Sequence, residues 1–249
     1  PPMKRLILPD THIPFHDKRV VDRWLNPAAQ LRPDGVDIIG DLLDCYCLSR
    51  FDKNPERKDS LQDELDQAHE FLREVRSVVG PKCDIRYTEG NHEQRLKRVL
   101  WGNCKALSGL RGLGIPQLLK LDELRVQWFP TGLPYRIGGL WFMHGDIIRK
   151  HAGATARATS DRVDGSVVLG HSHRMGYAPT TGWQGIRHAW EVGHVCNWRK
   201  LEYLTGCPQW QQGWAVAYIK AGWVDVSFVR VERRPGRHGT SFIFQGGTL

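Results

Sequence analysis

The stretch KRLILPDTH, residues 4–12, decides how this chain folds. Its apolar run ends at a proline and is followed at once by Asp10 and His12, which is typical of a buried strand that delivers polar side chains at its carboxyl end. The pattern recurs in VDIIGD, residues 36–41, after a helical stretch over residues 18–31. Short buried strands that alternate with helices predict an α/β fold.

Three more predicted strands end in polar side chains of the same kinds. They are residues 83–88, followed by Asn91 and His92; residues 140–143, followed by His144; and residues 167–169, followed by His171 and His173. The carboxyl ends of strands in α/β folds converge on one crevice. Side chains spread over residues 10–173 can therefore meet at one site.

The side chains in these clusters are of types that bind metal ions. Imidazole, carboxylate and amide oxygen suit Mn²⁺, Fe or Zn²⁺ better than the metals that prefer thiolates. The pairs Asp10/His12 and His171/His173 are spaced i, i+2, so both members of a pair point to one face of an extended segment. Taken singly, such clusters are also explained as turns or helix caps. Five clusters, all at strand ends, predict a site with enough ligands for two metals.

We expect one domain over residues 3–249. A chain of 249 residues can bury a core without disulfides or a structural metal. The glycine-rich residues 102–114 are a candidate insertion or lid, and residues 174–249 are expected to be rich in β-strands, with a hairpin over residues 214–231. The six cysteines contain no CxxC pair, which favours reduced, structural thiols over a zinc ribbon.

The composition limits the kinds of molecule that the protein is expected to bind. Lys and Arg number 35 against 27 Asp and Glu, a formal net charge of +8, which favours an acidic partner. No apolar run approaches the ~20 residues that cross a bilayer, and the first residues do not resemble a signal peptide. We expect no membrane association and a cytoplasmic location.

The five clusters resemble the signature of the calcineurin-like metallophosphoesterases, which is D-x-H, G-D-x-x-D, G-N-H-[DE], an isolated His often in H-G-D, and G-H-x-H. The corresponding residues are Asp10 to His12, Gly40 to Asp44, Gly90 to Glu93, His144 to Asp146, and Gly170 to His173. The resemblance implies a four-layer α-β-β-α sandwich of two mixed sheets, with metals at the carboxyl ends of the strands. Residues 174–249 carry no motif.

The resemblance also implies two sets of metal ligands that share Asp41. One metal would be held by Asp10, His12, Asp41 and His173, and the other by Asp41, Asn91, His144 and His171. Two divalent ions of this kind clamp a phosphate and activate a bridging hydroxide for in-line attack. We expect Mn²⁺, with Fe, Zn²⁺ or Ni²⁺ as alternatives.

Other residues near the motifs are expected to act on the substrate. By resemblance, His92 faces the phosphate without binding metal and stabilises the transition state or protonates the leaving oxygen. Asp44 is expected to fix the His92 ring. His16, Arg95 and Arg174 are candidate substrate-binding residues, although a solvated loop is an equal explanation for His16.

Charge and aromatic content bear on the substrate. Basic residues follow several motifs, where they could reach phosphates next to the scissile one, although a charged surface also keeps a protein in solution. Serine/threonine phosphatases of the family carry an arginine directly after the second aspartate of G-D-x-x-D, where this chain has Cys45. Six of the ten Trp follow residue 180; they could stack on unpaired bases, but packing in the β-rich part is the simpler explanation.

Three functions are compatible with these features. The basic charge and the missing phosphatase arginine favour a phosphodiesterase acting on DNA, RNA or a nucleotide-like diester. A phosphomonoesterase or nucleotide pyrophosphohydrolase would use the same metal site. A non-catalytic binding module is least favoured, because no expected ligand is missing.

Overall fold

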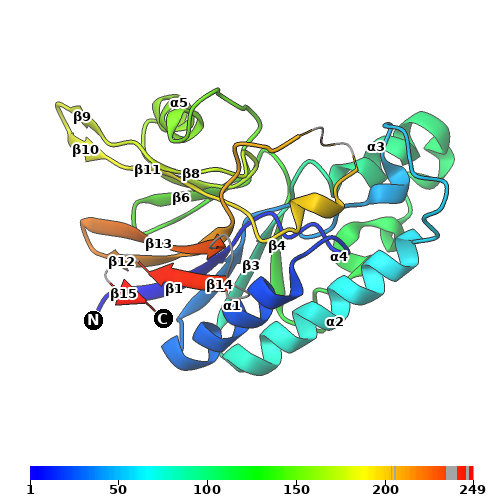
Figure 1. The fold of residues 1–249 in the computed structure, drawn as a ribbon, viewed down its shortest axis with the longest axis horizontal. Helices are drawn as coiled ribbons and strands as arrows, with labels where there is room; N and C mark the ends of the chain where they lie inside the picture. The colour runs from blue at the N-terminus through cyan, green and yellow to red at the C-terminus, as the bar shows by residue number, and fades with distance from the viewer. Residues whose placement is uncertain (203, 205, 234–239, 245–246, 249) are drawn as a thin grey trace.

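The computed structural model describes residues 1–202, 204, 206–233, 240–244 and 247–248. Two β-sheets lie face to face, and helices cover the outer side of each (Figure 1). None of the helices in the described part of the chain has both the length and the apolar character needed to cross a bilayer.

The first sheet has eight strands. In spatial order they are β15 (Gly247–Thr248), β14 (Thr240–Phe244), β13 (Trp223–Arg233), β12 (Gly213–Lys220), β1 (Met3–Leu8), β2 (Gly35–Ile38), β3 (Asp84–Thr88) and β4 (Val126–Phe129). The last four are mutually parallel, whereas β12 to β15 pair antiparallel. The β12–β13 hairpin confirms the one expected over residues 214–231.

The second sheet has five strands. Their order is β5 (Tyr135–Ile137), β6 (Leu140–Met143), β7 (Ser166–Leu169), β11 (Ala189–Val192) and β8 (Met175–Tyr177). β6, β7 and β11 are parallel, and β5 and β8 are antiparallel to their neighbours. Both sheets are therefore mixed. A separate hairpin of β9 (Thr180–Gly182) and β10 (Gly185–Arg187) extends beyond the sheets (Figure 1).

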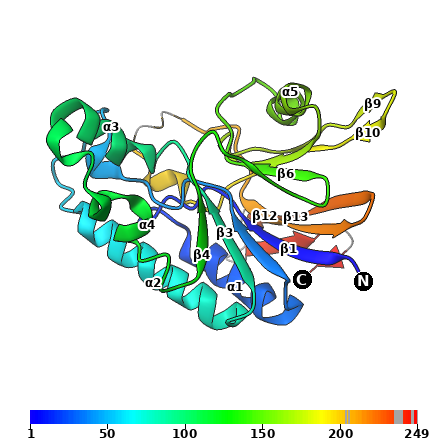
Figure 2. The same ribbon diagram turned by 180° about the vertical axis from the view of Figure 1, so that it is seen from behind.

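The helices form the outer layers (Figure 2). They are α1 (Lys18–Leu31), α2 (Leu61–Val79), α3 (Gln94–Asn103) and α4 (Ile115–Leu118) on the side of the first sheet, and α5 (Ala154–Val163) on the second. The α2 N-terminus is fixed by a capping box, in which Ser60 accepts from the Asp63 N–H and the Asp63 carboxylate accepts from the Ser60 N–H. Such a cap satisfies N–H groups that the helix leaves unpaired.

Successive side chains along a strand point to opposite faces of its sheet, so the apolar core is divided into layers between the sheets and layers under the helices. On β1, Leu8 packs with the α1 and α2 side chains, while Ile7 packs between the sheets. On β7, Val168 packs between the sheets and Val167 packs with Ala156 of α5. Successive strand residues point to opposite faces, so each sheet has two apolar faces. The predicted four-layer sandwich is confirmed.

Two parts of the chain differ from the sequence-based expectation. Helix α5 was not predicted, because its buried residues are Thr155, Ala156, Thr159 and Ser160, which give no apolar period. The stretch 102–114 has some structure of its own, with short 3-10 helices η2 (Lys105–Leu107) and η3 (Arg111–Leu113). Its role as a lid stays a prediction.

Candidate metal centre

The predicted ligands lie on five loops, each directly after a parallel strand. β1, β2 and β3 of the first sheet and β6 and β7 of the second deliver them. In the described part of the chain, three groups of side chains could hold a metal ion. Two of them match the predicted ligand sets: Asp10, His12, Asp41 and His173; and Asp41, His144 and His171. The ligand atoms within each group lie within 4.8 Å of one another. Asp41 belongs to both groups, as expected of a bridging carboxylate.

In the first group, four ligand atoms face one another in a buried space. Nε2 of His173 lies 3.1 Å from Oδ1 of Asp10 and 3.1 Å from Nε2 of His12. Oδ2 of Asp41 is 3.8 Å from the same His12 atom. Burial lowers the pKa of His173 well below its usual value, so the ring is neutral, the form that binds metals. Converging carboxylates and neutral imidazoles fit a divalent cation.

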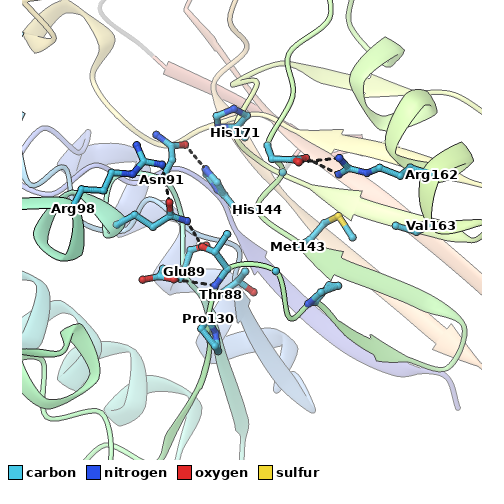
Figure 3. Close-up of a pocket in the computed structure, with 16 residues that line it drawn as sticks. Thr88, Glu89, Asn91, Arg98, Pro130, Met143, His144, Arg162, Val163 and His171 are labelled. Atoms are coloured by element: carbon cyan, nitrogen blue, oxygen red, sulfur yellow. Dashed lines mark hydrogen bonds and ion pairs between the residues drawn. The ribbon is translucent and has the colours of Figure 1, made fainter. Parts of the chain in front are cut away.

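The second group surrounds His144. Its Nδ1 lies 2.9 Å from the carbonyl of Ile39, and its Nε2 lies 3.2 Å from Asp41 Oδ2. The same Nε2 lies 3.0 Å from Asn91 Oδ1 (Figure 3). Burial by itself lowers the pKa of His144, but the charge and hydrogen bond of Asp41 outweigh it and raise the pKa to about 10. The Asp41 charge that attracts this proton would equally attract a metal cation, which would displace the proton from His144.

The backbone at the ligands is strained. Asp10, His12, Asp41, His171 and His173 all have φ between 34° and 66°, the left-handed region that side chains other than glycine disfavour. Such positions cost of order 1–3 kcal/mol each and cluster at functional sites. Five in one cluster therefore point independently to a functional site.

Two motif glycines give ligand side chains the room they need. A Cβ at Gly90 would lie 2.1 Å from Oδ1 of Asp41, and one at Gly170 would lie 2.3 Å from Oδ2 of Asp10. Neither distance is compatible with a side chain. Gly90 thus lets the loops after the neighbouring strands β2 and β3 approach each other, and Gly170 lets a loop of the second sheet approach a loop of the first.

Asp44 lies between two imidazoles. Its Oδ2 is 2.9 Å from Nδ1 of His12 and 3.3 Å from Nδ1 of His92, and the three could themselves hold an ion. Burial raises the pKa of Asp44, but the two imidazole hydrogen bonds outweigh it and leave the pKa well below its usual value. An ionised Asp44 fixes both rings through Nδ1, which leaves both Nε2 atoms facing Asp41 at 3.8 Å.

Arg95 joins this cluster from the first turns of α3. Nη1 donates to the Asp44 carbonyl at 2.8 Å and is 3.2 Å from Asp44 Oδ1, while Nη2 lies 3.2 Å from His92 Nε2. Burial lowers the pKa of His92, but Asp41 and Asp44 outweigh it and raise the pKa above its usual value. A cation and an imidazole that can hold a proton thus lie side by side.

Two buried glutamates support the loops and were not predicted from the sequence. Glu93 accepts hydrogen bonds from the N–H groups of Gly90, Asp41 and Leu43 and from the Tyr87 hydroxyl, so it joins the loops after β2 and β3. Its place in the G-N-H-[DE] motif was the available signal.

Glu191 on β11 accepts from the Ala156 N–H at 3.0 Å and from the Ser172 hydroxyl at 2.9 Å. It thereby fixes the loop that carries His171 and His173. No motif marks it in the sequence.

A cavity of about 450 Å³ opens beside the second group. Asn91, His144 and His171 line it, with Arg98 and Arg162 on opposite sides (Figure 3). Arg162 is paired with Asp146 through contacts of 2.8 and 2.5 Å, whereas Arg98 donates to the neutral Gln94. Arg98 therefore keeps its charge available to a bound anion.

His16 and Arg174, the two remaining residues predicted to bind substrate, do not line this cavity. Burial, with Lys18 and Lys200, lowers the pKa of His16 to about 4, so the ring is neutral at pH 7. Arg174 donates to the carbonyl of Arg149. Substrate contact by either residue stays a prediction, as do the metal-binding roles of the seven ligands.

Solved structures with this architecture place the fold in a known class. A dimetal phosphatase from Danio rerio has a TM-score of 0.50 and 11% identity, covering 92% of this chain and 96% of that one. Wild-type Vps29 from Entamoeba histolytica, solved with Zn²⁺, has a TM-score of 0.50 and 12% identity, covering 97% and 99%. The chain has the calcineurin-like metallophosphoesterase fold, as the five motifs predicted.

Similar sequences come from two phages. The Gene 54 protein of Mycobacterium phage L5 is 29% identical over 228 residues, covering 86% of this chain and 88% of the relative. The Gene 54 protein of Mycobacterium phage D29 is 29% identical over 240 residues, covering 91% and 92%. No family model matches the sequence.

Proposed function

We propose that this chain is a metal-dependent phosphodiesterase that acts on nucleic acid. The observation that carries the proposal is the membership of Asp41 in both ligand groups, since a shared carboxylate is what two adjacent divalent ions require. Two such ions, when bound, would polarise a phosphate and lower the pKa of the attacking water. Mn²⁺ suits the mixture of imidazole, carboxylate and amide donors.

Arg95 and His92 would supply the remaining chemistry. The Arg95 guanidinium can donate to phosphate oxygens in the manner of the arginine that the sequence lacks after Asp44. His92, with Nδ1 held by Asp44, would give a proton from Nε2 to the leaving oxygen. For this, Nε2 must be protonated and Arg95 must turn from His92 to the phosphate.

Cavities beside both ligand groups favour a diester over a monoester. The 450 Å³ cavity reaches Asn91, His144 and His171. A second cavity, of about 290 Å³, is lined by Trp210. The centroid of the Trp210 ring lies 4.0 Å from the centroid of the ring of His173, which belongs to the first group. A diester has substituents on both sides of phosphorus, and a monoester has one.

Hydrolysis of paired substrates tests the proposal. Bis-aryl and mono-aryl phosphates, and single- and double-stranded DNA and RNA, are compared with Mn²⁺ and with chelator. We expect metal-dependent turnover that favours the bis-aryl ester, and cleavage of nucleic acid at low salt. A preference for the mono-aryl ester would indicate a phosphomonoesterase, and absence of all turnover would indicate a binding module.

A further inference from the structure

The 290 Å³ cavity combines aromatic and cationic side chains. Trp198 and Trp210, both partly buried, line it together with Arg199 and Arg230. The Arg199 guanidinium carbon lies 5.3 Å from the centroid of the Trp198 ring. Glu232 also lines the cavity and is 3.9 Å from Arg230, which leaves an excess of one positive charge among these residues.

One wall of this cavity, Trp210, also contacts a predicted metal ligand. The centroid of the Trp210 ring lies 4.0 Å from the centroid of the His173 ring and 5.6 Å from that of the His194 ring. The next residue, Gln211, donates its N–H to the His173 carbonyl at 3.0 Å. Only the Trp210 ring and the Gln211 backbone therefore lie between a ligand in the cavity and His173.

Flat aromatic faces next to arginines suit a nucleobase and its phosphate. Bases stack on Trp regardless of their sequence, and Arg adds cation–π attraction and contacts the backbone. A base within a duplex already has both faces stacked on its neighbours, whereas an unpaired base can turn into a side cavity. The cavity therefore favours an unpaired base.

We propose that the Trp198–Trp210 cavity is a nucleobase subsite, which makes single-stranded nucleic acid the preferred substrate. This inference rests on the phosphodiesterase function proposed above. The phosphate joined to the stacked nucleoside would lie at the first ligand group, and Arg199 and Arg230 would contact the strand next to it.

Variants of Trp198 test the subsite. We measure kcat/KM with Mn²⁺ on two substrates. The first is a short single strand, either oligothymidylate or oligouridylate, whichever the wild type cleaves faster. The second is bis(4-nitrophenyl) phosphate, and the quantity compared is the ratio of the first kcat/KM to the second. We expect Trp198→Leu to lower this ratio about 5- to 100-fold, the loss of one stacked base, and Trp198→Phe to restore most of it. Trp183→Leu, at the exposed tip of the β9–β10 hairpin, is the matched control and should leave the ratio unchanged.

A binding measurement keeps the test valid if Trp198→Leu misfolds, because Trp198 also packs against a small apolar cluster. Arg199 is exposed, and Arg199→Met should weaken binding of the labelled strand in fluorescence anisotropy and reduce the salt slope by about one. Equal loss on both substrates, unchanged strand binding in Arg199→Met, or wild-type preference for the duplex would overturn the subsite. Failure of the wild type to hydrolyse the bis-aryl ester would instead overturn the phosphodiesterase function.

Discussion

Nη2 of Arg95 lies 3.2 Å from Nε2 of His92, on the side of the imidazole that faces Asp41. A guanidinium can only donate hydrogen bonds, so in this arrangement Nε2 accepts and Nδ1 carries the proton toward Asp44. A phosphate oxygen arriving at the site could replace the imidazole as the acceptor of Arg95. The pair is thus arranged to exchange partners when a substrate binds.

His92→Ala separates catalysis from metal binding. We expect turnover of the bis-aryl ester to fall by about 10²- to 10⁴-fold, as on loss of a general acid, while the metal content by mass spectrometry stays at the wild-type level. His151→Ala, on an exposed loop, should change neither quantity. Loss of metal with retained turnover would mean that His92 is a ligand.

Arg95→Met tests the phosphate contact. We expect kcat/KM to fall by about 10- to 100-fold, because a charge-assisted hydrogen bond contributes about 1.5–3 kcal/mol. Arg95→Lys should recover only part of it, since an ammonium lacks the planar fork with which the guanidinium contacts both Asp44 and His92. Arg157→Met on the exposed side of α5 is the control; an equal loss there would assign the effect to surface charge.

Asp41→Asn should abolish stabilisation by metal. Mn²⁺ at 100 times its Kd adds about 2.7 kcal/mol per site, or about 5–10 °C in Tm for a domain of this size. We expect wild type to show this rise and chelator to reverse it, whereas Asp41→Asn shows little response. Asp146→Asn, whose carboxylate pairs with Arg162, should respond like wild type. An undiminished rise in Asp41→Asn contradicts the shared-ligand arrangement.

Glu64 makes folding stability depend on pH. Burial, then the charge of Asp44, raises the pKa of this α2 carboxyl from 4.5 to about 8, against opposing contributions from the Tyr46 and Cys45 N–H groups and Arg95. The folded state therefore holds a proton that the unfolded state releases above pH 4.5. The contribution of Glu64 to stability is full below that pH and declines until about pH 8, by up to about 5 kcal/mol.

Glu64→Gln, which resembles the protonated acid, should remove most of this decline. The free energy of unfolding by urea, measured for both proteins across the same pH range, checks it. Parallel pH curves for wild type and Glu64→Gln would show that the carboxyl is ionised in the folded protein.

The sequence predicted the five strand ends well because each motif combines a short apolar run with polar residues directly after it. It could not predict α5, whose buried face consists of Thr155, Ala156 and other small residues. The presence of Trp198 and Trp210 in one cavity depends on how η4 (Trp198–Lys200) and the loop before β12 are placed relative to each other and to His173, which local sequence does not reveal. Glu191 was missed for the same reason, since its partners lie 19 and 35 residues away.

The predicted metal ligands come from both sheets of the sandwich. Asp10, His12 and Asp41 follow strands of the first sheet, whereas His144 and His173 follow strands of the second. Ions bound among them would act as non-covalent cross-links between the two halves of the sandwich. The spacing of the sheets would then affect how well each ligand group closes around its ion, so a substitution in the core between the sheets, far from any ligand, would weaken metal binding.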